Sequence, residues 1–218
     1  MSYILNIETA TKNCSISIAK QGETLLCKEM AEQGYSHAEK LHVFIAEALQ
    51  ELQIDFSDLS AIAVSQGPGS YTGLRIGVSA AKGLCYALDI PLIAIDTLEV
   101  LAAQLSVSEG LIIPMIDARR MEVYNAIFDK NHQKIRDTKA EIITEESFSE
   151  IEGTIHLIGD GALKCADILK DARFVYYPEN TYPSAKEMSL LSFEKHKKSD
   201  TVDVAYFEPF YLKDFMIK

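Results

Sequence analysis

A glycine-rich segment with hydroxyl side chains, GPGSYTGLRIG at residues 67–77, is the first candidate for chemistry in this chain. It follows an apolar run and leads into a stretch of small residues, an arrangement typical of a loop between a strand and a helix. Such a loop can bind a phosphate through the free N–H groups at the start of the helix. The absence of side chains can also allow another part of a protein to come unusually close.

The segment fits neither of the common phosphate-binding patterns. A Walker loop places a lysine after its last glycine, whereas here Gly73 is followed by Leu74 and Arg75. A dinucleotide loop has a glycine at its sixth position, where this chain has Thr72. The hydroxyl groups of Ser70 and Thr72 at the helix start leave anion binding open.

The alternative is packing, because small residues recur along the helix that we expect over residues 71–88. Glycine inside a helix costs about 1 kcal/mol relative to alanine, so several glycines need a structural reason. Close approach of another backbone provides one, and the neighbour is either the chain's own sheet or a helix of a partner. If it is a partner, Gly77→Leu should abolish binding with the fold retained. The small residues are Gly73, Gly77, Ala80, Ala81 and Gly83.

Composition limits the classes of function. The chain has 218 residues, of which 48% are hydrophobic, and its net charge is −11. It is long enough for one large or two small cores. An acidic chain is poorly suited to gripping nucleic acid by itself, since that affinity comes largely from Lys and Arg. No apolar run approaches the roughly 18 residues of a membrane span and no signal peptide is recognisable, so we expect a cytoplasmic protein.

The N-terminal half predicts a sheet with helices. Residues 3–30 read as three strands in an antiparallel meander. An amphipathic helix is expected over residues 36–53, where Ser36 and Glu39 form a capping box. Its apolar face includes Leu41, Phe44 and Ile45. Further strands and helices then alternate, which indicates a mixed sheet of α/β type.

The second half of the sequence weakly repeats the pattern of the first. ILNIETATKNCSISIAK and IPMIDARRMEVYNAIFD each read as an apolar strand ending in an acid, a polar turn and an alternating strand. We expect two lobes, residues 1–104 and 105–218, with a hinge within residues 101–110. The aromatic C-terminal segment is expected to pack back on the body.

A mixed sheet made twice, with an acid at the end of each first strand, resembles the actin-like (ASKHA) fold. In that fold two ribonuclease H-like subdomains, each a five-stranded mixed sheet flanked by helices, face a nucleotide cleft. The resemblance implies nucleotide binding by Glu8, Thr9 and Thr11, with Glu8 in the place of an acid that helps to hold magnesium. Glutamate in place of the usual aspartate departs from that geometry. The turn with Asp117, Arg119 and Arg120 reads instead as a solvated hairpin with a local ion pair.

Several motifs together are more specific. GPGSYTGLRIG beside the opening IETATKNCSISI closely resembles the signature of the TsaB (YeaZ) family. SHAEKL, PMIDARRMEVYNAIF, IGDG and the closing EPFYLKD match the same family in order. The resemblance covers nearly the whole chain.

The resemblance implies a required but non-catalytic assembly subunit. Its partner, a TsaD homologue, transfers threonylcarbamoyl to N6 of adenosine 37 in tRNAs that read ANN codons. A TsaE ATPase joins the complex, and tRNA is bound only through the complex. No cofactor is intrinsic to the subunit, with ATP or ADP allowed at or near the partner interface. The two first-lobe helices contact TsaD, or a second copy in a homodimer, through Leu41, Phe44, Ile45, Tyr71, Gly73, Arg75, Gly77, Ala80 and Ala81.

The alternative is an enzyme acting alone, either an M22-like metallopeptidase or an ASKHA-type ATPase. A TsaD-like metal site uses two histidines one helical turn apart, so that both imidazoles share a face. His37 and His42 are instead five residues apart, or roughly 140° around a helix. We therefore assign no metal ligand and no catalytic residue.

Overall fold

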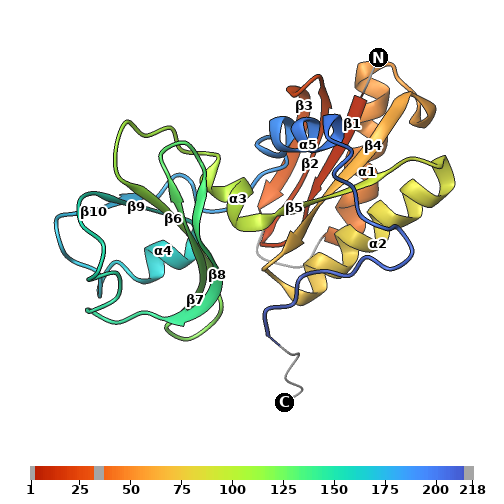
Figure 1. The fold of residues 1–218 in the computed structure, drawn as a ribbon. Helices are drawn as coiled ribbons and strands as arrows, with labels where there is room; N and C mark the ends of the chain where they lie inside the picture. Colours follow the sequence, from red (N-terminus) through yellow and green to blue (C-terminus); the bar gives the residue numbers. More distant parts are fainter. Residues whose placement is uncertain (1–2, 32–36, 214–218) are drawn as a thin grey trace. The chain divides into compact units, whose positions relative to one another are not determined.

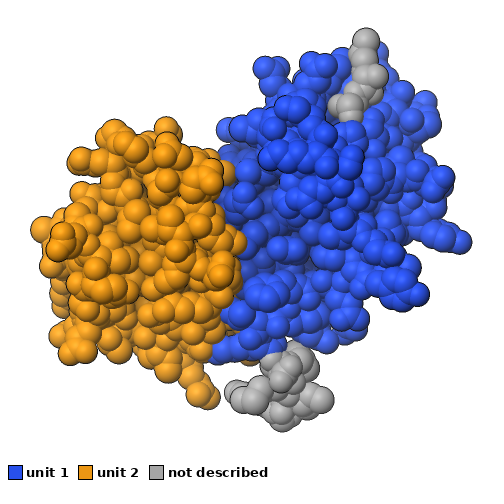
Figure 2. Space-filling view, viewed as in Figure 1, with its two compact units in different colours: residues 1–100, 184–218 blue, residues 101–183 orange. Residues whose placement is uncertain are grey.

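The computed structural model describes residues 3–31 and 37–213, and the chain divides into two compact units. Residues 1–100 and 184–218 belong to the first unit, and residues 101–183 form the second (Figure 2). Each unit is built on one five-stranded mixed sheet (Figure 1). The expected α/β fold of two such sheets flanked by helices is therefore confirmed.

The sheet of the first unit has the strand order β3-β2-β1-β4-β5. β1 pairs with β2 in antiparallel and with β4 in parallel orientation. The helices expected over residues 36–53 and 71–88 correspond to α1 and α2, although Ser36 lies outside the described residues. The strands are β1 (Tyr3–Glu8), β2 (Asn13–Lys20), β3 (Glu23–Ala31), β4 (Leu59–Gly67) and β5 (Leu92–Asp96), and the helices are α1 (His37–Leu52), η1 (Phe56–Asp58), α2 (Tyr71–Leu88), α3 (Thr97–Ala102) and α5 (Met188–Lys197).

The second unit repeats this order as β8-β7-β6-β9-β10, as the weak sequence repeat predicts. Here β6 pairs antiparallel with β7 and parallel with β9. The helix after the fourth strand of this unit is only five residues long. The elements are β6 (Leu111–Asp117), β7 (Glu122–Asp129), β8 (Lys134–Ile142), β9 (Ile155–Ile158), α4 (Asp160–Lys164) and β10 (Phe174–Tyr177).

The two faces of the first sheet have different covers. Alternate side chains of the strands point to opposite faces, so Leu5 and Ile7 pack with α1 and α2, while Ile4 packs with Met188 of α5. Figure 1 shows α5 on one side of this sheet and α1 and α2 on the other. The core of the unit therefore has two layers, one on each face.

The chain returns to the first sheet after residue 183, which corrects the expected boundary between the lobes. Ser17 Oγ donates to the Ala185 carbonyl at 2.6 Å, and the Ala185 N–H donates to Ser15 Oγ at 3.0 Å. Met188 is fully buried beside β1, β4 and β5. Residues 184–218 therefore belong to the first unit, not to a lobe spanning 105–218.

The C-terminal segment packs back on the body, as expected. Val202 forms a bridge to Leu92 of β5. Lys82 of α2 donates to the carbonyls of Ala205 and Phe207, and the Phe210 N–H donates to Gln66 at 2.7 Å. This segment therefore runs along α2 and covers the end of β4.

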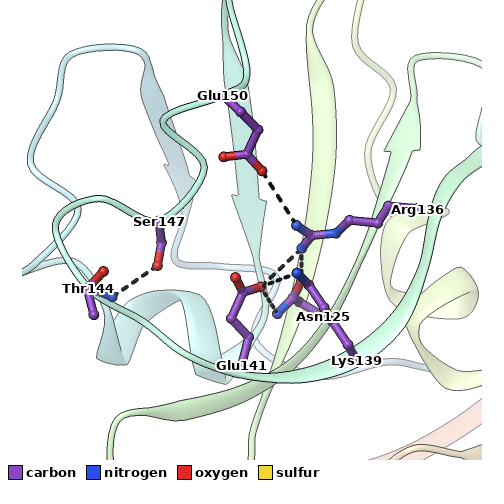
Figure 3. A network of polar contacts seen from close by, with 7 residues as sticks. All are labelled: Asn125, Arg136, Lys139, Glu141, Thr144, Ser147 and Glu150. Carbon is purple, nitrogen blue, oxygen red and sulfur yellow. Dashed lines mark hydrogen bonds and ion pairs between the residues drawn. The ribbon is translucent and has the colours of Figure 1, made fainter.

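A polar network holds the outer strand of the second sheet (Figure 3). The guanidinium of Arg136 on β8 donates to Asn125 on β7 and pairs with Glu141 at 3.2 Å. Asn125 also donates to Glu141, and Arg136 lies over the ring of the buried Phe148. Arg136 is thus occupied by its own sheet and loop.

In the part of the chain that the structure describes, no helix combines the length and apolar character of a membrane span.

Substitutions on α5 test the corrected boundary. Met188→Ala should lower the free energy of unfolding by about 2–4 kcal/mol, since it leaves a cavity beneath the first sheet. Leu190→Ala, at a position that is 60% exposed, should change it by about 0.5 kcal/mol or less. Chemical denaturation measures both. Equal, small effects would contradict the packing of α5 on this sheet.

Candidate functional site

The glycine-rich segment joins β4 to α2 and is fixed to the turn between β1 and β2. Ser70 caps the helix by accepting a hydrogen bond from the Gly73 N–H at 3.3 Å. The Ser70 N–H donates to the Ala10 carbonyl at 2.6 Å. Thr9 Oγ1 donates to the Gly73 carbonyl at 2.8 Å. The start of α2 is therefore held by backbone and side-chain groups of residues 9 and 10.

Three glycines permit this contact. A Cβ added to Gly69 would lie 2.3 Å from the Ala10 carbonyl oxygen, and one added to Gly73 would lie 2.1 Å from that of Thr9. At Gly77 it would lie 2.2 Å from Thr9 Oγ1. Side chains do not approach backbone atoms this closely in folded proteins, so the turn seats directly on the helix. The close neighbours of these glycines belong to the chain's own turn: backbone atoms at Gly69 and Gly73, and the Thr9 side chain at Gly77.

Six of the nine expected interface residues are buried inside the first unit, which corrects their assignment. The apolar face of α1 covers the sheet, because each helix of a single layer buries that face against the strands. Gly77→Leu would drive a side chain into Thr9 and Ile7, so we now expect this variant to destabilise the fold as well as to impair any binding. The six are Leu41, Phe44, Ile45, Gly73, Gly77 and Ala81.

The other three expected residues lie nearer the surface. Arg75 is exposed, and Tyr71 and Ala80 are half-buried. The guanidinium of Arg75 lies 5.1 Å from the centre of the Tyr71 ring, which is itself 4.9 Å from the ring of Tyr211. The C-terminal segment thus covers part of Tyr71.

Gly83 has no such internal neighbour. A Cβ added there meets no atom within 4 Å. The adjacent Tyr86 is 87% exposed. Gly83 lies roughly 120° around the helix from Gly77, a phase difference that sequence reasoning could have used to separate the two. We call the exposed side of this helix, with Arg75, Ser79, Ala80, Gly83 and Tyr86, the outer face of α2.

A shallow groove of about 590 Å³ borders the outer face. It lies between α2 and the C-terminal segment, and Lys82 of α2 donates hydrogen bonds to two carbonyls of that segment. Gly83 leaves room in it because it has no side chain. The groove is lined by Lys82, Gly83, Tyr86, Asp203, Val204 and Ala205.

The three residues expected to bind a nucleotide meet in the turn after β1. Glu8 is fully buried, accepting hydrogen bonds from the Ala10 N–H at 2.6 Å and from the Ser65 hydroxyl. Burial raises the pKa of this carboxyl to about 7, against the opposing effect of the two hydrogen bonds. Thr9 and Thr11 are also buried. The three side chains are occupied in holding the turn that seats on α2.

The Glu8 carboxyl does not fit a magnesium ligand in this arrangement. Both oxygens accept hydrogen bonds from the chain, and its raised pKa favours the neutral form, which binds a hard cation poorly. Nucleotide binding by Glu8, Thr9 and Thr11 stays a prediction. Within residues 3–31 and 37–213, no three His, Cys, Asp or Glu side chains gather in a way that could hold a metal ion. His37 Nε2 lies 2.9 Å from the Thr11 carbonyl, and His42 is exposed.

Comparison with known proteins places this architecture in a family. Residues 29–214 match the TsaD family model, described as tRNA N6-adenosine threonylcarbamoyltransferase. The tRNA threonylcarbamoyladenosine biosynthesis protein TsaB of Bacillus subtilis (strain 168) is 32% identical, covering 96% of this chain and 93% of its own length. The chain belongs to the TsaB (YeaZ) family. The Escherichia coli (strain K12) TsaB is 29% identical, with 97% and 94% covered.

Solved structures agree with membership of the TsaB family at the level of fold. YeaZ from Pseudomonas aeruginosa superposes with a TM-score of 0.84 at 24% identity, covering 97% of this chain and 100% of its own. The tRNA N6-adenosine threonylcarbamoyltransferase of Bacillus anthracis is 36% identical, but over only 43% of this chain and 32% of its own. This chain therefore shares part of its sequence with that transferase.

Alanine at two glycines should separate the inner and outer faces of α2. Gly73→Ala should destabilise the protein by about 1–3 kcal/mol, because its Cβ meets the Thr9 carbonyl. Gly83→Ala should stabilise it by about 1 kcal/mol, since alanine is the better helix former and space is open. Thermal and chemical unfolding measure both. Changes of the same sign would contradict the assignment.

Glu8 should make stability depend on pH. The native state holds the proton up to about pH 7, whereas the pKa of a free glutamate side chain is 4.5. Between these values the native state binds more protons than the unfolded one, so stability falls as pH rises through this window and then levels off. Relative to Glu8→Gln, the wild type should lose about 3 kcal/mol between pH 4.5 and 8. The free energy of unfolding of both proteins is measured by denaturant titration at these two pH values. An equal change in the wild type and in Glu8→Gln would rule out a buried Glu8 with a raised pKa.

Proposed function

We propose that this chain is the non-catalytic assembly subunit of the bacterial complex that transfers threonylcarbamoyl to N6 of adenosine 37 in tRNAs reading ANN codons. A TsaD homologue is the catalyst in this proposal. Membership of the TsaB family supports the pathway, and sequence shared with a threonylcarbamoyltransferase supports the partner. The outer face of α2 is the observation that carries the assembly role.

Gly83 is the central feature of that face. A glycine in the middle of a helix costs about 1 kcal/mol relative to alanine, and no internal contact of this chain requires it. A partner helix that approaches closely would require it. Tyr86 beside it is largely exposed, and tyrosine is enriched at the centres of protein interfaces. The outer face therefore has the features of a helix-binding surface.

The charge of α2 favours an acidic partner surface, because this helix is positive although the chain as a whole is negative. The net charge is −11, yet α2 carries Arg75 and Lys82 and no acidic residue. A partner surface with small apolar residues and an acidic rim would complement it. In the absence of the TsaD homologue, the same face would pair two copies of this chain only more weakly, because like charges would then meet.

The non-catalytic part of the proposal rests on how the polar residues are used. Glu8, Thr9 and Thr11 hold the turn beneath α2. Burial and the nearby Glu8 raise the pKa of the Cys14 thiol to about 11, which keeps it protonated and weakly nucleophilic. We assign catalysis to the TsaD homologue and ATP turnover to a TsaE ATPase. ATP or ADP would lie at or near the partner interface, tRNA would bind through the complex, and the complex would act in the cytoplasm.

Gly83→Leu tests the proposal. It should weaken binding to the same organism's TsaD homologue by roughly tenfold or more, because the side chain holds the partner helix away. The melting temperature should not fall. Size-exclusion chromatography with light scattering and titration calorimetry measure assembly and affinity.

Lys197→Leu is the matched control, since it adds an exposed leucine on α5, across the sheet from α2. It should assemble normally. A folded Gly83→Leu variant with unchanged affinity would exclude the outer face, and a wild-type chain that never forms a heteromer would exclude the assembly role.

A further inference from the structure

The tip of the β6–β7 hairpin has an unusual composition. Arg119 and Arg120 both have left-handed backbones, with φ of 70° and 53°. Residues other than glycine and asparagine rarely adopt this conformation. The β2–β3 turn also has two successive left-handed residues, Gln21 and Gly22, but uses a glycine for one of them. Two exposed arginines therefore occupy left-handed positions that glycine or asparagine would adopt more readily.

The turn beneath them is firmly held. Asp117 Oδ1 accepts from the Arg119 N–H at 2.7 Å and from Lys164 Nζ at 2.5 Å. Lys164 also donates to the Glu122 carbonyl, and the Asp117 N–H donates to Asp160. The local ion pair expected in this turn is thus Asp117 with Lys164, not with an arginine. Asp117, the acid two residues before Arg119, is therefore already engaged.

Both guanidinium groups remain unpaired among residues 3–31 and 37–213. Neither takes part in a hydrogen bond, ion pair or ring contact there. The other arginines are engaged: Arg75 over Tyr71, Arg136 with Glu141 (Figure 3), and Arg173 with the Ile151 carbonyl. Two adjacent, unpaired cations on a firmly held tip stand out in a chain of net charge −11.

We propose that the Arg119–Arg120 tip binds a phosphate group of the RNA on which the complex acts. A guanidinium matches two phosphate oxygens at once, and a held turn loses little freedom on binding. The acidic remainder of the chain would weaken RNA binding, so the isolated chain would make this local contact only weakly and the complex, by holding the RNA, would strengthen it. The inference rests on the proposed function, which supplies the RNA.

The variant Arg119→Asn/Arg120→Asn tests the tip without disturbing the turn, because asparagine tolerates the left-handed conformation. The control Lys170→Ala/Lys198→Ala removes the same charge from exposed positions elsewhere. The measurement is tRNA affinity of the complex with the TsaD homologue against salt. The asparagine variant should bind on the order of tenfold more weakly near 0.1 M salt, with a salt slope smaller by about 1, as expected for the loss of one phosphate contact. The control should bind nearly as the wild type does.

Three outcomes would overturn the inference. Equal losses in variant and control would mean that only net charge matters. Loss of assembly with the TsaD homologue, rather than of RNA binding, would mean that the tip meets an acidic protein surface. Amide shifts of residues 118–122 in the labelled full chain with inorganic phosphate or ADP, but not with tRNA, would assign the phosphate to a nucleotide.

Failure of the assembly step itself would count against the proposed function and leave the tip to a separate measurement. The labelled full chain is then titrated with tRNA at low salt. Shifts of residues 118–122 in the wild type but not in the asparagine variant would support the tip. The absence of shifts in the wild type would refute it.

Discussion

The contact between the β1–β2 turn and the glycines of α2 determines the rest of the first unit. The Thr9 and Ala10 carbonyls lie where side chains at Gly73 and Gly69 would be. This brings the helix against the sheet at backbone distance and fixes its rotation about its own axis. Burial of Glu8 follows from the same contact, because the turn that holds its carboxyl is covered by the helix and by Ser65. The polar groups of this turn therefore act in packing.

A helix fixed in this way presents two faces with different roles. The inner face carries the glycines that the fold requires. The outer face carries Gly83, where an added Cβ would meet no other atom of the chain, and Tyr86, which is exposed. This division agrees with the proposed role of the chain in assembly. A rigid backing is useful for such a surface, because a partner then binds without paying for ordering of the helix.

The sequence predicts the elements well and their neighbours less well. The bounds of α1 and α2 follow from apolar periodicity, and the repeated sheet order follows from the resemblance between the two halves. The division at residue 183 was missed because the polar contacts of Ser15 and Ser17 with residues 184–189 join segments far apart in the chain. Periodicity identifies the buried side of a helix but not what covers it, so Leu41 and Phe44 were assigned to a partner instead of the sheet. The pairing of Asp117 with Lys164 rather than an arginine likewise depends on α4 packing beside β6.

Hydroxyl-radical footprinting of this chain with and without the TsaD homologue tests the central claim most directly. Tyr86 on α2 and Leu190 on α5 are both largely exposed, on opposite sides of the first sheet. If the outer face of α2 is the assembly surface, oxidation of Tyr86 falls on complex formation while that of Leu190 is unchanged. Protection of Leu190 with an unchanged Tyr86 would contradict the account.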